Sequence, residues 1–267
     1  MTTSSWEYAG RTKLMNPIDD EFFRKMAEDP EFCQEILQVI LGDRELVIEE
    51  VIPQDAIKNL QGRSVVLDAL CRKCDGSYCH VEVQKSNDDD HIRRVRYNSS
   101  CITTNIVDVG SRFENVPDVY VIYISKSDFL HTGLTICHVD NVIRETKEVV
   151  DDGLYRVFVN ATVKDGSDVS ELMDIFTESN KYNYEKFPKT SERKRTFKER
   201  KEGQQEMSDI VREICEEVEA KSERKRRIVD VELVQKNLGL DLPQACAAFG
   251  MTVEEYEEMK SLLKNEE

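Results

Sequence analysis

The chain has 267 residues, of which 39% are hydrophobic and 34% are charged, and its formal net charge is −16. This length suits one full domain with an appended segment, and the high charged fraction predicts an extended, solvated helix. The negative charge argues against a protein that is basic overall and coats DNA non-specifically, but it leaves room for a local basic surface.

The sequence predicts a helix over residues 16–42, which Asn16-Pro17 opens and Gly42 ends. Its apolar residues recur at helical spacing: Phe22, Phe23, Met26, Phe32, Ile36, Leu37 and Ile40. A strand is predicted at residues 46–52.

A β-hairpin is predicted next, because two runs rich in β-branched and aromatic residues, 63–73 and 77–84, flank an Asp75-Gly76 turn signal. Glu82 and Gln84 lie two residues apart in an extended strand, so they share a face. The hairpin therefore places an acid and an amide side by side.

The turn decides whether Asp68 joins them. A two-residue Asp-Gly turn places Asp68 opposite Val83, on the wrong face. A three-residue loop of Cys74, Asp75 and Gly76, with Gly76 in the left-handed region, places Asp68 opposite Glu82, with Cβ atoms roughly 5 Å apart.

Four elements are predicted after the hairpin. The run Asp88–Asp90 caps a helix from about 90 to 107, and residues 119–125 form a strand buried on both faces. Further strands are expected at 134–139 and 154–160, with a helix at 168–177. This order predicts a mixed α/β fold with one central sheet flanked by helices.

The composition changes after about residue 180. Residues 191–228 hold no proline and one glycine, which predicts a long charged amphipathic helix. Its apolar stripe, within residues 205–220, favours packing against a domain or a homo-oligomer interface. The basic stretch 189–201 is interpreted either as a solvated face or linker or as a nucleic-acid contact.

The tail, residues 242–259, has the helix, glycine-containing turn and helix of a helix-turn-helix. Its second helix carries Glu254, Glu255, Glu257 and Glu258, which DNA would repel. A small packing or protein-contact module is therefore expected.

Two facing carboxylates predict a metal site, because like charges opposite each other in a sheet are destabilising unless a cation lies between them. Asp68 and Glu82 would hold Mg²⁺ or Mn²⁺ through oxygen, with the carbonyl of Val83 as a candidate further ligand. Gln84 would position the nucleophile by hydrogen bonding.

The eight cysteines suggest free thiols in a reducing cytoplasm, since the sequence has neither a secretory signal nor an apolar run long enough to span a membrane. Cys71, Cys74, Cys79 and His80 have a zinc-like spacing. However, Cys71 and Cys74 have opposite parity near the hairpin tip, so zinc is the less favoured interpretation.

Residues from about Leu14 to Glu178 resemble the PD-(D/E)XK nuclease superfamily. The resemblance is greatest to its bacterial recombination-promoting nuclease and transposase family, whose members carry a Glu-x-Gln version of the last motif. The residues that carry it are Asn16-Pro-Ile-Asp-Asp-Glu-Phe-Phe-Arg-Lys25, Leu67-Asp68, Val81-Glu-Val-Gln84, Arg93-Arg-Val-Arg-Tyr97, Val116–Ile124, Asp152-Gly153 and Phe158-Val-Asn160.

The resemblance implies a restriction-endonuclease-like fold with Asp68 and Glu82 as metal ligands and Gln84 in place of the catalytic lysine. It adds Asp20 as an acid from the first helix, with Asp19 and Glu21 as alternatives. It also implies that Arg94 and Tyr97 support the site or contact DNA.

The chain departs from the pattern at two positions: no proline precedes Asp68, and Asn98 replaces the second residue of a frequent Tyr-Tyr pair. Gln84 follows the Glu-x-Gln version of the family and lacks the charge of the superfamily's lysine. Read without the resemblance, Asp20 would simply stabilise a helix N-terminus, Arg94 and Tyr97 would lie on a solvated helix face, and His80 and His91 would be surface residues.

The expected organisation is a nuclease-like domain at 14–180, a basic linker and amphipathic helix at 181–228, and a small helical tail at 229–267. The expected function is Mg²⁺-dependent endonuclease cleavage of DNA, in the service of recombination or transposition of mobile DNA. The alternatives are a catalytically weak or inactive module that binds DNA or regulates on the same fold, and a structural oligomer built around the 205–220 helix.

Overall fold

The computed structural model describes residues 12–52, 67–86 and 90–265. The described residues up to Ser208 form one compact unit, and those from Asp209 onward form a second. No helix in these described ranges is both long enough and apolar enough to cross a membrane.

The first unit is built on a six-stranded mixed sheet in the order β1-β2-β3-β4-β8-β5. The strands β3, β4 and β8 run parallel to one another. The strand β2 is antiparallel to both of its neighbours, β1 and β3, and β5 is antiparallel to β8. Their bounds are β1 Ile48–Ile52, β2 Ala69–Lys73, β3 Tyr78–Gln84, β4 Val119–Ser125, β5 Ile136–Val139 and β8 Leu154–Asn160. The predicted α/β class is confirmed.

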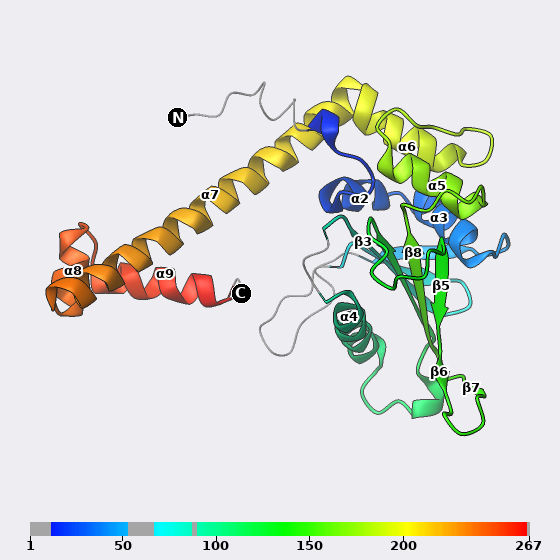
Figure 1. The fold of residues 1–267 in the computed structure, drawn as a ribbon, viewed down its shortest axis with the longest axis horizontal. Helices are drawn as coiled ribbons and strands as arrows, with labels where there is room; N and C mark the ends of the chain where they lie inside the picture. The colour runs from blue at the N-terminus through cyan, green and yellow to red at the C-terminus, as the bar shows by residue number, and fades with distance from the viewer. Residues whose placement is uncertain (1–11, 53–66, 87–89, 266–267) are drawn as a thin grey trace. The chain divides into compact units, whose positions relative to one another are not determined.

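Helices cover both faces of this sheet (Figure 1). The helix α4 (His91–Ile106) lies on one face, and the other face is covered by α2 (Asp20–Ala27), α3 (Pro30–Leu41), α5 (Asp168–Thr177) and α6 (Pro188–Glu199). Three short elements complete the unit: the 3₁₀ turn η2 (Phe113–Asn115) and a two-strand ribbon of β6 (Asn141–Val142) and β7 (Val149–Val150).

The single helix predicted over 16–42 is wrong, because the segment forms two helices. Pro30 starts α3 at its first turn, and the Asp29 side chain caps it by accepting a hydrogen bond from the Glu31 amide. The apolar spacing alone concealed this break, since both helices bury one stripe in the same core. Gly42 ends α3 in the left-handed region, as predicted (φ 66°).

The core beneath these helices is aromatic. Phe23, Phe32 and Phe176 form a cluster with ring centroids 5.8 to 6.4 Å apart, and Phe22 packs edge-on against Phe197 of α6. All five rings are buried. Four helices are therefore fixed to one another, and the first turn of α2 is held in place.

The predicted long helix over 191–228 is also interrupted, because Arg200 leaves helical geometry (φ −81°, ψ 137°) between α6 and α7 (Lys201–Leu238). The two helices approach closely where Gly203 faces Thr196. A Cβ added at Gly203 would lie 2.3 Å from the Thr196 carbonyl oxygen, so only glycine fits there.

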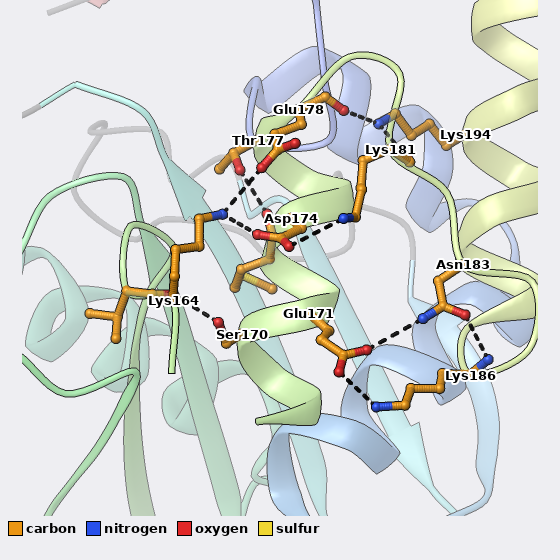
Figure 2. Close-up of polar contacts among 12 residues, drawn as sticks. Lys164, Ser170, Glu171, Asp174, Thr177, Glu178, Lys181, Asn183, Lys186 and Lys194 are labelled. Carbon is orange, nitrogen blue, oxygen red and sulfur yellow. Dashed lines mark hydrogen bonds and ion pairs between the residues drawn. The ribbon is translucent and has the colours of Figure 1, made fainter. Parts of the chain in front are cut away.

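The basic stretch 189–201 packs into the first unit, which corrects its interpretation as a solvated face or linker. Lys194 is fully buried and donates to the carbonyls of Ile175, Glu178 and Lys181 at 2.8, 2.5 and 3.1 Å. Figure 2 shows its amine directed at Glu178. Glu35 of α3 accepts hydrogen bonds from the amides of Lys189 and Thr190 at the start of α6. Much of this basic charge therefore anchors α6.

The second unit is a small helical module with its own core. The C-terminal part of α7 packs with α8 (Leu242–Ala248) and α9 (Val253–Asn265). Six buried residues form the core: Ile228, Val231, Ala245, Cys246, Met251 and Tyr256. Asp241 and Gln244 form a capping box at α8, and Gly250 supplies the left-handed turn (φ 68°) of the predicted helix, turn and helix.

Candidate active site

The β2–β3 hairpin has the register that aligns its acids. The Lys73 amide donates to the Ser77 carbonyl at 2.8 Å, and the Gly76 amide donates to the Lys73 carbonyl at 2.9 Å. The loop between them is Cys74, Asp75 and Gly76, with Gly76 at φ 88°. Ala69 pairs with Val81, so the next position outward sets Asp68 against Glu82, as the three-residue loop predicts.

Asp68 is held at its position by two donors. The Nε of Arg24, on α2, donates to Oδ1 at 2.9 Å, and the amide of Val83 donates to Oδ2 at 2.9 Å. The Asp68 residue is only 4% exposed. These bonds fix the carboxylate against the backbone of the neighbouring strand.

Glu82 is held by the helix on the same face of the sheet. Arg94 donates from Nε to Oε1, and Asn98 donates from Nδ2 to Oε2 at 2.5 Å. Residues four apart lie on one side of a helix, which is why α4 presents both donors together. Glu82 is 1% exposed, so this acid is the more deeply buried of the pair.

Burial raises the pKa of both acids. Burial, and then the charge of Glu82, raise the pKa of Asp68 to about 6, against the opposing effect of Arg24. Burial also raises the pKa of Glu82, against the opposing effect of Arg94. Two neighbouring carboxylates whose pKa values are both raised by burial form a site that a cation would stabilise.

Asp20 is the N-terminal acid that faces this pair. Burial, and then the charge of Asp68, raise the pKa of Asp20 to about 6. Asp19 is engaged elsewhere, since its carboxylate accepts from the Asn16 amide at 2.8 Å and pairs with Lys85 at 2.5 Å. Glu21 acts on Asp20 as a further like charge. Among the three alternatives, the electrostatics favour Asp20.

Gln84 is buried, with 7% exposure, at the end of β3. Its Nε2 donates to Ser86 Oγ at 2.7 Å, whereas its Oε1 has no hydrogen-bond partner among the described residues. This oxygen is an acceptor left open beside Glu82. Gln84 itself brings no charge, so the positive charge at the site comes from Arg24 and Arg94.

The two histidines of this region are buried, which corrects the expectation that they are surface residues. His80 is fully buried, with Nε2 3.5 Å from Glu82 Oε2, and burial followed by the charge of Arg94 lowers its pKa to about 3. His91 packs on the ring of Phe129, and its Nδ1 lies 2.8 Å from the Tyr123 hydroxyl.

Arg24 and Asn98 are functional candidates that the sequence analysis missed. A usable signal existed for each, because Arg24 lies four residues after Asp20, and Asn98 lies four residues after Arg94. Tyr97, by contrast, is 38% exposed, so of the sequence-predicted pair the half-buried Arg94 contacts Glu82 and Tyr97 lies at the surface.

The donor set suits a hard divalent cation held by few protein ligands. Within the described ranges, no group of three or more His, Cys, Asp or Glu side chains is arranged to hold a metal. Mg²⁺ commonly takes only one or two carboxylates and completes its coordination with water and substrate phosphate. Each carboxylate oxygen that accepts one hydrogen bond keeps a further lone pair, so Asp68 and Glu82 fit this pattern.

The zinc alternative gains no support from the cysteines. Cys71 and Cys79 are cross-strand neighbours and buried, whereas Cys74 lies exposed in the loop. All eight cysteines are free.

Comparison with known protein families gives one match, to the PD-(D/E)XK nuclease family transposases, over residues 22–238. The chain belongs to this family. No curated protein and no solved structure matches it. The match covers the described sheet, the hairpin with Asp68 and Glu82, α4 and all of α7, and it confirms the resemblance drawn from the sequence motifs.

Proposed function

We propose that this member of the PD-(D/E)XK family is a divalent-metal-dependent DNA endonuclease that hydrolyses phosphodiester bonds. The observation that carries the proposal is the buried pair of Asp68 and Glu82, set opposite each other by the hairpin register. Nucleases of this superfamily generally use divalent metals. A role in recombination or transposition of mobile DNA follows from the family and belongs to the same proposal.

Asp68 and Glu82 would hold the metal, Mg²⁺ or Mn²⁺, with the carbonyl of Val83 as a further candidate ligand, and Asp20 would add an acid from α2 to the same site. When bound, such an ion polarises a phosphoryl oxygen and lowers the pKa of a coordinated water. Arg94 and Asn98 keep Glu82 in one rotamer, and Arg24 and the Val83 amide do the same for Asp68.

Gln84 would orient the attacking water. Its Oε1 is an unpaired acceptor among the described residues, so it can take a hydrogen bond from the nucleophile. It cannot provide the positive charge of a lysine. The Arg24 side chain is 30% exposed and uses Nε for Asp68, so its remaining N–H groups can donate to a substrate phosphate.

Cleavage of supercoiled plasmid DNA with Mg²⁺ or Mn²⁺ tests the proposal. We expect Asp68→Asn and Glu82→Gln to reduce the cleavage rate by about 1,000-fold, because each removes a charge that holds the metal. Asp75→Asn is the matched control, since Asp75 is an exposed acid in the loop of the same hairpin. Equal cleavage by the wild type and both site variants would refute the nuclease proposal.

A second candidate function is a catalytically weak or inactive module on the same fold that binds DNA or regulates. The observation that favours it is the neutralisation of both acids by Arg24 and Arg94, together with the uncharged Gln84. Calorimetric titration with Mn²⁺ separates it from a purely structural protein. Site-specific heat that Asp68→Asn abolishes, without plasmid cleavage by the wild type, would favour this candidate.

We retain the proposal that residues 205–220 of α7 mediate homo-oligomers. Val218 is 61% exposed on this helix. Light scattering on wild type and Val218→Glu tests it, since a charge in an apolar interface should lower the oligomer mass. An unchanged mass would exclude this stretch as the interface.

A further inference from the structure

Three polar residues lie in one row across the carboxyl ends of the parallel strands. Gln84 of β3 pairs in register with Ser125 of β4, and Ser125 pairs with Asn160 of β8. Side chains alternate along a strand, so this row shares its face with Glu82, two residues earlier. The row begins at the candidate active site and runs away from it across the sheet.

The row is buried, with exposures of 7% for Gln84, 0% for Ser125 and 8% for Asn160. Two residues earlier on β4 and β8, the same face holds the rings of Tyr123 and Phe158. A polar side chain at such a depth is unfavourable unless its groups are hydrogen-bonded. The change from rings to short polar side chains therefore calls for a ligand or an internal partner.

Internal partners satisfy only part of the row. Asn160 Oδ1 accepts from the Thr162 amide at 3.0 Å and from the Thr162 hydroxyl at 2.7 Å. In the described part of the chain, Asn160 Nδ2 and Gln84 Oε1 have no hydrogen-bond partner. Ser125 Oγ lies 2.9 Å from Ser127 Oγ and accepts from the Ser127 amide.

A buried polar group without a hydrogen-bond partner is unfavourable, so two of them at the two ends of one row need an explanation. Their location supplies one, because ligands of open α/β sheets bind at the carboxyl ends of the strands. Lys126 follows Ser125 and is exposed, and its amide donates to the Gln84 carbonyl at 3.0 Å. A cation thus adjoins the row.

We propose that Ser125 and Asn160 form a subsite for the DNA backbone next to the phosphate cleaved at Asp68 and Glu82. The amide of Asn160 and the hydroxyl of Ser125 donate to phosphate oxygens, which is the common role of such neutral side chains on DNA. Neighbouring strands are about 4.8 Å apart, so the row spans roughly 10 Å, or about three nucleotides at about 3.4 Å each. The contact carries no base specificity.

This subsite rests on the proposed nuclease function for its ligand, and its test separates the two. The full-length protein is titrated into a fluorescein-labelled DNA duplex with Ca²⁺ in place of Mg²⁺, and anisotropy gives the dissociation constant without turnover. We expect Asn160→Asp to weaken DNA binding at least about tenfold, since it replaces the Nδ2 donor, which has no partner among the described residues, with a negative acceptor. Asn115→Asp, an exposed position, is the matched control for the added charge.

Ser125→Ala guards against a folding artefact, because it removes one hydroxyl and leaves the backbone unchanged. If Asn160→Asp unfolds, a threefold or larger loss of DNA affinity in Ser125→Ala, with an unchanged Mn²⁺ titration, supports the subsite. Wild-type affinity in Ser125→Ala overturns it in that case, and wild-type affinity in folded Asn160→Asp overturns it directly.

The outcomes of the two proposals are distinguishable. A wild type that does not cleave DNA, but whose DNA affinity falls with Asn160→Asp, retains the subsite without the nuclease. A wild type that cleaves DNA, with Asn160→Asp equal to it in affinity and in single-turnover rate, retains the nuclease without the subsite.

Discussion

Two groups of buried charged side chains in the first unit differ in how their charges are hydrogen-bonded. The ammonium group of Lys194 donates to three backbone carbonyls, which matches its three N–H groups (Figure 2). Asp68 and Glu82 are also paired, but with arginine side chains that are 30% and 31% exposed, and they repel each other. A buried ammonium group whose three N–H donors all bind backbone carbonyls has a structural role. A buried pair of carboxylates that repel each other and keep lone pairs open is suited to binding a cation.

The largest effect on stability should come from removing the hydrogen-bonded amine of Lys194. Lys194→Met keeps the volume of the side chain but leaves the carbonyls of Ile175, Glu178 and Lys181 without their donor. We expect the free energy of unfolding to fall by about 3 kcal/mol in urea denaturation. Lys189→Met is the control, since Lys189 lies on the same helix in an exposed pair with Glu31, and it should change by less than about 0.5 kcal/mol. Equal losses in both variants would contradict the structural role of Lys194.

Removing a charge at the carboxylate pair should affect activity rather than stability. Arg24→Gln should slow DNA cleavage about 30-fold, or about 2 kcal/mol, because the site then lacks a cation that Gln84 cannot replace. Restoring charge with Gln84→Lys in the Arg24→Gln background should recover part of the rate. Arg72→Gln, which removes an arginine paired with exposed acids on β1, is the control. No recovery in the double variant would mean that Arg24 serves only to position Asp68.

The anchoring of α6 can be weakened at a second point. Glycine to alanine normally stabilises a helix by about 1 kcal/mol, but Gly203→Ala should destabilise this protein by about 2 kcal/mol. The reason is the Thr196 carbonyl oxygen, 2.3 Å from the added Cβ. Thermal unfolding measures the change, with Glu202→Ala, at an exposed neighbouring position, as the control. A stabilised Gly203→Ala would disprove the close approach of α6 and α7.

The smallest expected effect is the pH dependence contributed by Lys194. Burial, and then the charge of Lys198, lower the pKa of its amine from 10.5 to about 7, while Glu178 acts in the opposite direction. The Tyr182 ring, 5.1 Å away, adds no charge. Between pH 7 and about 10 the unfolded chain therefore binds more protons than the folded one, so folding stability from this group rises with pH.

The measurement compares wild type with Lys194→Met at pH 7 and pH 9.5. We expect the stability difference between them to be larger at the higher pH. A difference that shrinks on raising the pH would show that the three carbonyls hold the amine in its charged form.

The sequence predicted the sheet and the acid pair well, because both depend on local signals. Alternation placed Glu82 and Gln84 on one face, and the three-residue loop ending at Gly76 placed Asp68 opposite Glu82. The helices over 91–106 and 168–177 were found close to their observed bounds for the same reason. The breaks at Pro30 and Arg200 were missed, because the apolar period continues through each of them.

Four features depend on contacts between distant parts of the chain, although the spacing of Arg24 after Asp20 and of Asn98 after Arg94 gave a signal for those two. Arg24 and Asn98 reach the acids from helices on separate parts of the chain, and the depth of His80 depends on α4 lying over β3. The sequence pattern around Lys194 indicates a solvated charge, yet the side chain is buried against the end of α5. Each depends on which elements meet in space.

The sequence by itself determined the strand periods, the turn chemistry and the family motifs, because these depend on neighbours along the chain. Only the tertiary structure decided which charges are satisfied. Hydrogen-bond partners and burial are set by residues far apart in sequence, and they separate the carboxylate pair, still open to a ligand, from the fully bonded Lys194. Within the described part of the chain, they also leave Asn160 Nδ2 and Gln84 Oε1 without a hydrogen-bond partner at the carboxyl ends of two parallel strands.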